Sequence, residues 1–341
     1  MAKTTSSRQA AAPAAPIEIG VLVYPQAQLA AVYGLGDLFA VATRLAGEKH
    51  GRHAPALRVS HWRLAARGRR VQRAYDTHAG LPGEPAVLIV PPRLGEAPDA
   101  RCSGRLAAWL RERHAAGAVL ASVCAGAFLL AESGLLDGRT VTTHWACTDD
   151  LAARYPQLRV DGQPLIIDDG DIITAGGLMA WTDLGLRIVD RWLGPAVMAE
   201  TARFLLVDPP GREQRYYSTF SPRLTHGDGA ILKVQHWLQS RGAREISVTA
   251  MAAQAHLETR TFQRRFQRAT GLRPLEYCQH LRVGKAREML ESGRQAVEQI
   301  AWRVGYEDAS AFRRIFQKVM GLSPGEYRHR FGQCARAPRH A

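Results

Sequence analysis

The last third of this chain contains the same pattern twice, and this repeat constrains the fold more than any other feature. The segments Met251–Leu257, Phe262–Phe266 and Gly271–Pro274 return as Ile300–Tyr306, Phe312–Phe316 and Gly321–Pro324. Each copy reads as a helix, a tight turn and a second helix, and each second helix carries an Arg pair on its polar face. Two such units in one short basic domain predict a protein that reads two neighbouring stretches of DNA major groove.

The positive charge of the chain is concentrated in the same region. From Pro222 to Ala341 there are 21 Lys and Arg residues against 10 Asp and Glu, whereas the other 221 residues carry 24 against 21. This asymmetry places a polyanion-binding function in the C-terminal part. The alternative is an ordinary solvated basic surface, but the repeat and the charge fall together, which favours nucleic acid.

A chain of 341 residues is long enough for two domains, each with its own core. Its five cysteines have neither metal-ligand spacing nor the density of a disulfide framework, so we expect a reducing cytoplasm, no metal and no cofactor. The first 16 residues lack the apolar segment of a signal peptide, and no apolar run has the length of a membrane span, so no membrane partner is expected. Residues 1–16 and 332–341 are expected to be tails, the first of them disordered.

From Ile17 onward, apolar β-branched runs alternate with helix-length segments. Strands are expected at 17–24, 57–66, 86–90 and 118–123, a hairpin at 165–174, and helices at 29–46, 104–116 and 176–192, the last opening at Gly176-Gly177. This alternation is typical of a mostly parallel sheet that is covered by helices on both faces.

The candidate chemistry of this region lies at Ser122-Val-Cys124-Ala-Gly126. A strand ends there in a turn of small residues, and a helix over 125–132 begins at once, so Cys124 is expected at the carboxyl edge of the sheet. The helix N-terminus predicts a lowered thiol pKa and a thiolate. His144 ends a strand over 140–143 that is expected to neighbour the strand of Cys124. The plainer alternative for Cys124 is a buried structural cysteine.

In the repeated region, the first support helix is expected at 248–255, the turn at 256–258 and the recognition helix at 259–269. The second copy is expected at 297–304, 305–307 and 308–319, and a helix over 275–291 would set the separation of the two units. Phenylalanines at spacing four face the core in both recognition helices: Phe262 and Phe266, then Phe312 and Phe316. Arg and Gln side chains lie off this apolar stripe and suit the reading of guanine and adenine, although any one Arg can instead contact only phosphate.

The stretch Ala121–Trp145 resembles the nucleophile-elbow region of the DJ-1/PfpI superfamily, which has a class I glutamine-amidotransferase-like fold. The chain resembles still more closely the GlxA-like regulators, in which such a domain is fused to an AraC/XylS-type DNA-binding domain, and the match spans nearly all of 17–331. The resemblance implies an α/β sandwich with a parallel-rich sheet, followed by an all-α domain with two helix-turn-helix units. The domain limits that we expect are 17–210 for a sensor domain, 211–227 for a linker and 228–331 for the DNA-binding domain.

The resemblance also implies an effector pocket at Asp37, Cys124, His144 and Trp145 and no catalytic residue. Asp37 takes the place of the family's Glu and is shorter by one methylene, which puts its contact with the thiol in doubt. Ala125 stands where the peptidase branch has a His, which argues against a peptidase. The effector would be a small metabolite, often a nitrogen-containing one. The alternatives are a solvated or capping role for Asp37 and core packing for Trp145.

The same resemblance identifies the DNA-facing residues. They are Arg260, Gln263 and Arg264 in the first unit and Ser310, Ala311, Arg313 and Arg314 in the second. Arg268 is expected to contact DNA as well, because it lies off the apolar stripe of the first recognition helix. The implied protein is a promoter-binding regulator, more often an activator, that binds double-stranded DNA as a homodimer and has RNA polymerase as a further partner. Two alternatives remain open at Cys124, namely a cysteine-dependent hydratase- or amidase-like enzyme and a redox sensor.

Overall fold

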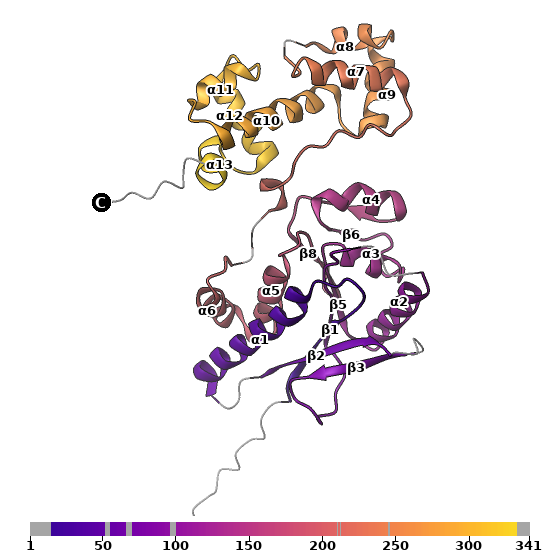
Figure 1. The fold of residues 1–341 in the computed structure, drawn as a ribbon, viewed down its shortest axis with the longest axis vertical. Helices are drawn as coiled ribbons and strands as arrows, with labels where there is room; N and C mark the ends of the chain where they lie inside the picture. Colours follow the sequence, from indigo (N-terminus) through magenta and orange to yellow (C-terminus); the bar gives the residue numbers. More distant parts are fainter. Residues whose placement is uncertain are drawn as a thin grey trace, which may run out of the picture. The chain divides into compact units, whose positions relative to one another are not determined.

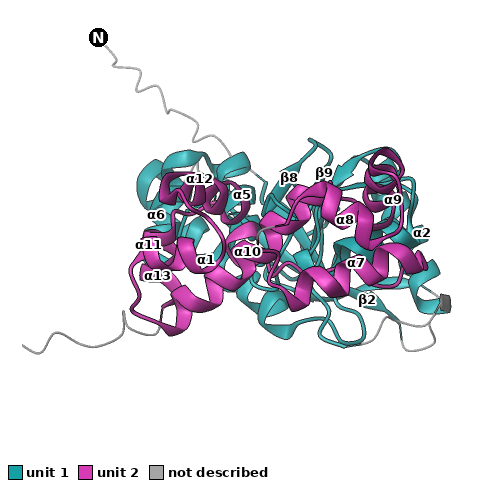
Figure 2. Ribbon diagram, turned by 90° about the horizontal axis from the view of Figure 1, so that it is seen from above, with its two compact units in different colours: residues 1–214 teal, residues 215–341 magenta. Residues whose placement is uncertain are grey.

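A computed structural model describes residues 15–51, 55–65, 70–95, 100–209, 211, 213–244 and 246–332. The chain divides into two compact units, residues 1–214 and residues 215–341, which are coloured separately in Figure 2. The expected linker, 211–227, contains this boundary, but Gln214 belongs to the first unit and Arg215 to the second. The expected tails lie outside the described residues, apart from residues 15, 16 and 332.

In its described part, the N-terminal unit is built on a seven-stranded sheet in the order β3-β2-β1-β4-β5-β9-β8. The strands are β1 (Ile17–Leu22), β2 (Leu57–Leu64), β3 (Val71–Asp76), β4 (Val87–Val90), β5 (Val119–Val123), β8 (Ile166–Asp168) and β9 (Ile172–Ala175). The five central strands run parallel, and the edge strands β3 and β8 are antiparallel to their neighbours. This arrangement confirms the predicted parallel-rich sheet.

Helices cover both faces of this sheet, with α1 and α5 on one side and α2 on the other (Figure 1). The helices are α1 (Leu29–His50), α2 (Ala100–Ala115), α3 (Gly126–Ala131), α4 (Thr148–Arg154), α5 (Trp181–Leu193) and α6 (Pro195–Leu205). Every side chain of β4 is buried because helices pack on both of its faces. The chain order reverses between β1 and β4, and in sheets of this kind ligands bind at the carboxyl ends of such strands.

Helix α1 is long enough and apolar enough to cross a membrane by length and composition alone. Its buried apolar residues, however, belong to the core of the N-terminal unit, where Leu35, Leu38 and Phe39 are almost completely buried. Gly185 of α5 lies so close to Leu38 that a Cβ atom there would be 2.8 Å from it. In this structure α1 is therefore the core helix of a folded domain.

Two elements differ from the sequence expectation. The helix expected from Gly176 begins only at Trp181, because the Gly176 N–H donates to the Leu165 carbonyl and the Gly177 N–H to the Gln214 side chain. The strand expected over 140–143 is shortened to β6 (Thr140–Val141), which pairs with β7 (Arg159–Val160) in a separate small sheet. The strand beside β5 is β9, so the prediction that the strand before His144 neighbours β5 was wrong.

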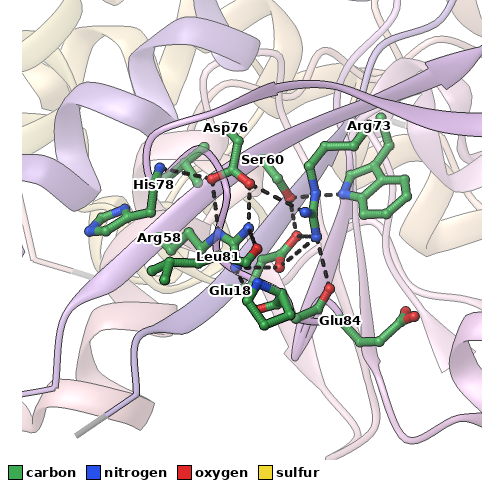
Figure 3. Close-up of polar contacts among 12 residues, drawn as sticks. Glu18, Arg58, Ser60, Arg73, Asp76, His78, Leu81 and Glu84 are labelled. Atoms are coloured by element: carbon green, nitrogen blue, oxygen red, sulfur yellow. Dashed lines mark hydrogen bonds and ion pairs between the residues drawn. The ribbon is translucent and has the colours of Figure 1, made fainter. Parts of the chain in front are cut away.

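A buried ion network holds the start of β1 to β2 and β3 (Figure 3). Arg58 is 1% exposed; its Nε lies 2.9 Å from Asp76, and its Nη1 lies 3.4 Å from Glu18. Arg73 Nη2 lies 2.9 Å from both oxygens of Glu18. The hydrogen bond from Arg58 holds the pKa of Asp76 below its usual range. This network lies at the amino ends of the parallel strands, away from the candidate site.

The regular secondary structure in the described part of the C-terminal unit consists of helices. Its helices are α7 (Gly229–Ser240), α8 (Val248–Gln254), α9 (Thr259–Thr270), α10 (Pro274–Ser292), α11 (Val297–Arg303), α12 (Ala309–Met320) and α13 (Pro324–Phe331). The repeated glycines, Gly271 and Gly321, have positive φ angles and end α9 and α12, and the prolines three residues later begin the next helices. The repeat seen in the sequence is therefore a repeat of helix ends.

Two separate hydrophobic cores stabilise this unit. One gathers around Phe262 and Phe266, and the other around Phe312 and Phe316. The helix α10 is shared, since its N-terminal part enters the first core and its C-terminal part the second. The phenylalanines predicted to face the core are all completely buried.

Candidate functional site

The elbow after β5 has the sharp backbone that the sequence predicts. Cys124 has a φ angle of 55°, a left-handed conformation that is uncommon for a residue other than glycine. Its N–H donates to the Ala175 carbonyl at 2.8 Å, and the helix α3 starts two residues later. A Cβ atom on Gly126 would lie 2.5 Å from the Val90 carbonyl oxygen, so the close approach of α3 to the end of β4 requires glycine here.

The ionisation predicted for Cys124 was wrong. The residue is 6% exposed, and burial raises the pKa of its thiol to about 11. The Ala125 N–H and the charge of Arg93 both lower this pKa, but they do not offset the cost of placing a thiolate in a buried position. Helix α3, whose N-terminus was expected to lower the pKa of this thiol, has only six residues. Cys124 is therefore a neutral thiol at pH 7.

The other residues predicted for the pocket occupy three different environments. Asp37 is exposed on α1, and no hydrogen bond or ion pair joins it to Cys124 in the described structure. The Nδ1 atom of His144 accepts the Ala146 N–H at 3.1 Å, so the imidazole caps the 3-10 helix Trp145–Cys147. The Trp145 ring lies against this imidazole, with 5.2 Å between centroids. Burial lowers the pKa of His144.

The backbone beside His144 does reach the elbow. The hydroxyl of Thr143 donates to the Cys124 carbonyl at 2.8 Å. The structure thus brings the segment before His144 to Cys124 through a threonine, while the thiol and the imidazole share no hydrogen bond among the described residues.

A cleft opens beside the elbow, at the carboxyl ends of β1 and β4. It encloses about 320 Å³ including its open mouth. It is lined by Tyr24, Arg93, Ser103, Ala125, Phe128, Leu129, Glu132 and Arg154. Among these, Ala125 directly follows Cys124, so the cleft adjoins the predicted pocket without containing the residues predicted for it.

Sequence reasoning missed the polar groups around this cleft and the elbow. The Tyr24 hydroxyl donates to the Pro91 carbonyl at 2.6 Å. Burial raises the pKa of Tyr24, Cys124 and Cys147, and the charge of Arg93 opposes this rise in all three. The Nε atom of Arg93 and the Oε1 atom of Gln28 are buried without a hydrogen-bond partner among the described residues. Their place in the sequence could have identified Tyr24 and Arg93, because these residues follow the ends of β1 and β4, and sheets of this kind bind ligands at the carboxyl ends of their strands.

The first recognition helix, α9, presents a polar face to solvent. Arg260, Gln263, Arg264 and Arg268 are all exposed, and none forms a hydrogen bond or ion pair within the part of the chain that the structure describes. The neighbouring Arg265 instead pairs with Asp228, the N-cap of α7, at 2.7 Å. Four uncommitted side chains of the types that read bases or phosphates therefore lie on one helix.

The second recognition helix, α12, has a similar polar face, but one of its arginines forms an ion pair within the protein. Ser310, Arg313 and Arg314 are exposed and Ala311 is half-buried. Arg313 forms an ion pair with Glu298 of the support helix α11, whereas Arg314 has no hydrogen bond or ion pair with the residues that the structure describes. Asp308 caps α12 by accepting the Ser310 and Ala311 N–H groups at 2.8 and 3.1 Å.

Comparison with known proteins agrees with both halves of this description. The model described as DJ-1/PfpI family matches residues 81–191, and the model described as helix-turn-helix domain matches residues 251–330. The HTH-type transcriptional regulator CdhR of Pseudomonas aeruginosa is 29% identical over 65% of this chain and 66% of that protein. The HTH-type transcriptional regulator GlxA of Rhizobium meliloti is 28% identical over 65% of this chain and 69% of that protein.

A solved AraC family transcriptional regulator from Pseudomonas putida is 20% identical over 56% of this chain and all of that chain, with a TM-score of 0.44. The chain spans about two thirds of the length of the two named regulators. It combines a DJ-1/PfpI-type α/β domain with an AraC-type helix-turn-helix domain, which confirms the resemblance and the fold class predicted from the sequence. Both named relatives are transcriptional regulators, the class of protein that the sequence predicts.

Proposed function

We propose that this protein is a cytoplasmic, sequence-specific transcription regulator that binds promoter DNA through residues 215–341 and a small metabolite through its N-terminal unit. The duplicated helix-turn-helix carries the DNA-binding part of the proposal. Each unit has its own core, and each recognition helix presents exposed arginines, with Gln263 beside them in α9 and Ser310 in α12. These side chains suit base edges and phosphates, and the surrounding charge favours a polyanion.

For the effector, the cleft beside the elbow supports an amino-acid-like metabolite. Arg93 lines the cleft, and its buried Nε lacks a hydrogen-bond partner among the described residues, so the guanidinium suits a carboxylate. Glu132 also lines the cleft and suits an ammonium group, although it already accepts a hydrogen bond from the Tyr155 hydroxyl at 2.9 Å and lies 3.6 Å from Arg154. The effector pocket that we propose comprises this cleft together with the predicted Asp37, Cys124, His144 and Trp145.

We further propose that the protein acts as a homodimer and activates transcription together with RNA polymerase, as the resemblance implies. An enzymatic or redox role for Cys124 is not favoured, because a thiol with a pKa of about 11 is a weak nucleophile at pH 7. We expect Cys124→Ser to retain DNA binding that depends on the effector. If the native protein instead converts a substrate at a measurable rate and this variant does not, Cys124 would be the nucleophile of an enzyme.

The experiment that tests the regulator is recovery of genomic DNA fragments that bind the purified full-length protein at about physiological salt. We expect a few enriched promoters that share a motif spread over roughly two turns of DNA. Uniform, salt-sensitive binding without a motif would contradict the proposal. The genes beside the enriched promoters would indicate the chemistry of the effector.

A further inference from the structure

The last residue of the N-terminal unit is a buried glutamine whose amide is fully engaged. Gln214 is 2% exposed, and its Oε1 accepts the N–H groups of Trp145 and Gly177, each at 3.1 Å. Its Nε2 lies 2.8 Å from the Thr143 carbonyl and within 3.1 Å of the Pro164 carbonyl and the Thr142 hydroxyl. A Cβ atom on Gly176 would lie 2.0 Å from this nitrogen, so the site admits the glutamine because residue 176 is glycine.

The groups that bind Gln214 are the ones that hold the elbow. The hydroxyl of Thr143 donates to the Cys124 carbonyl, while the carbonyl of Thr143 accepts from Gln214. On the other side, the Cys124 N–H donates to the Ala175 carbonyl, next to Gly176. Ala125 then forms part of the cleft wall. A change at the cleft can therefore reach Gln214 through two short hydrogen-bonded paths.

The residues that follow Gln214 are bound by the helix-turn-helix unit. Arg330 of α13 donates to the Tyr217 hydroxyl at 2.8 Å, and the Phe331 ring lies 5.5 Å from the Tyr217 ring. Arg287 of α10 donates to the Ser218 carbonyl at 3.2 Å and to the Thr219 hydroxyl at 2.7 Å. Arg215 donates to the carbonyl of Lys318 in the second recognition helix, α12, at 3.4 Å.

We propose that Gln214 couples the effector cleft to the DNA-binding unit, and this inference rests on the proposed function. The amide is anchored to the elbow, and the next residue along the chain is already anchored to α12, so no slack chain separates the two attachments. A rearrangement of the elbow that releases or redirects Gln214 displaces the segment from Arg215 to Thr219 and thereby biases the helix-turn-helix unit. Because coupling free energies are reciprocal, DNA binding must equally alter the elbow.

This reciprocity gives a test that does not need the effector. Hydrogen–deuterium exchange of full-length protein is measured with and without a promoter fragment recovered in the experiment above, for peptides that contain Cys124, Trp145 and Gly177. We expect DNA to change the exchange rate of the Trp145 and Gly177 amides in the native chain by about 5- to 150-fold. A flexible Gly-Ser insertion between Gln214 and Arg215 retains every contact but adds slack, and we expect it to abolish this change.

Two substitutions complete the design. Gln214→Ala removes the anchor, so both amides should exchange quickly with or without DNA. Gln157→Ala removes an exposed side chain of the same unit, whose amide donates to Asp137 at 3.0 Å and has no other hydrogen bond among the described residues, and this variant should behave as the native chain. A DNA-dependent change that persists in the insertion variant would overturn the coupling, and so would its absence in native protein that binds the fragment. Failure of the native chain to bind any promoter specifically would instead refute the proposed function.

Discussion

The elbow depends on one residue that lacks a side chain. Gly126 lies against the carbonyl oxygens of Val90 and Pro91, which are backbone atoms that cannot rotate away. We predict that Gly126→Ala destabilises the protein by about 1–3 kcal/mol, because the added methyl overpacks a buried contact. Gly104→Ala is the matched control: it adds a methyl to open space in helix α2, and helix propensity favours alanine by up to about 1 kcal/mol. Urea denaturation measures the stability of both variants, and equal unfolding midpoints would contradict the prediction.

The thiol of Cys124 gives a second prediction at this scale. Alkylation requires thiolate, and burial raises the pKa of this thiol to about 11, so the thiolate fraction is small at pH 7 and grows about tenfold per pH unit up to that pKa. We expect the iodoacetamide labelling rate of native protein, resolved by peptide mass spectrometry, to rise in this way between about pH 7 and 10. A rate that is already constant near neutral pH would show a thiolate instead.

The sequence predicted the position of Cys124 but not its ionisation. Small residues between an apolar strand and a helix define an elbow locally, whereas the pKa depends on burial by distant segments such as the one that contains Tyr24. Arg93 and Gln214 were missed for the same reason. Nothing in their local sequence marks them, and their roles arise only when the ends of β1, β4 and β5 come together.

At the scale of elements, the turn of each helix-turn-helix uses a left-handed residue, His256 in the first copy and Gly305 in the second. We predict that Gly305→Ala destabilises the second unit by about 1–2 kcal/mol, because alanine tolerates a φ of 90° poorly. Gly284→Ala, in open space on α10, should stabilise by about 0.5–1 kcal/mol. Urea unfolding followed by circular dichroism distinguishes the two variants, and a similar change in stability in both would contradict a cost specific to the positive φ angle of residue 305.

The polar face of α9 gives a prediction about DNA. Arg264 is exposed and uncommitted within the described residues, so we expect Arg264→Ala to weaken binding by about 1–3 kcal/mol and to relax preference at one base position. Arg265→Ala is the neighbouring control, because Arg265 pairs with Asp228 and should affect stability rather than base preference. Binding to a set of single-base variants of the recovered motif measures both. An equal loss on every sequence would make Arg264 a phosphate contact.

Elements with a strong local pattern were predicted well, and elements made by tertiary contacts were not. The phenylalanine stripe and the Gly–Pro helix ends placed α9, α10 and α12 to within one or two residues. Strand β3, with half-buried and exposed residues, was missed because its place at the sheet edge depends on the ion network of Arg58 and Arg73. The late start of α5 depends on Gln214, which lies 37 residues beyond Gly177.

For the whole molecule, the uneven charge predicts strongly salt-dependent DNA binding. Each phosphate contact releases counterions, so with about 6–10 contacts the affinity should fall about 10³- to 10⁵-fold between about 50 and 200 mM salt. Arg159→Ala, which removes an exposed charge from the N-terminal unit, should leave this slope unchanged. Fluorescence anisotropy titrations of the full-length protein measure the slope. An affinity independent of salt would contradict an electrostatic contribution from the basic unit.

The two separate cores of the DNA-binding unit have a consequence for how such a regulator acquires new targets. The core beneath α9 and the core beneath α12 have one helix in common among the described residues, α10. Changes in contacts that lie far apart combine nearly additively. The base preference of one helix-turn-helix unit can therefore change while the other unit still binds its part of the original promoter. New specificity can then arise through single substitutions, each of which leaves a protein that still binds DNA.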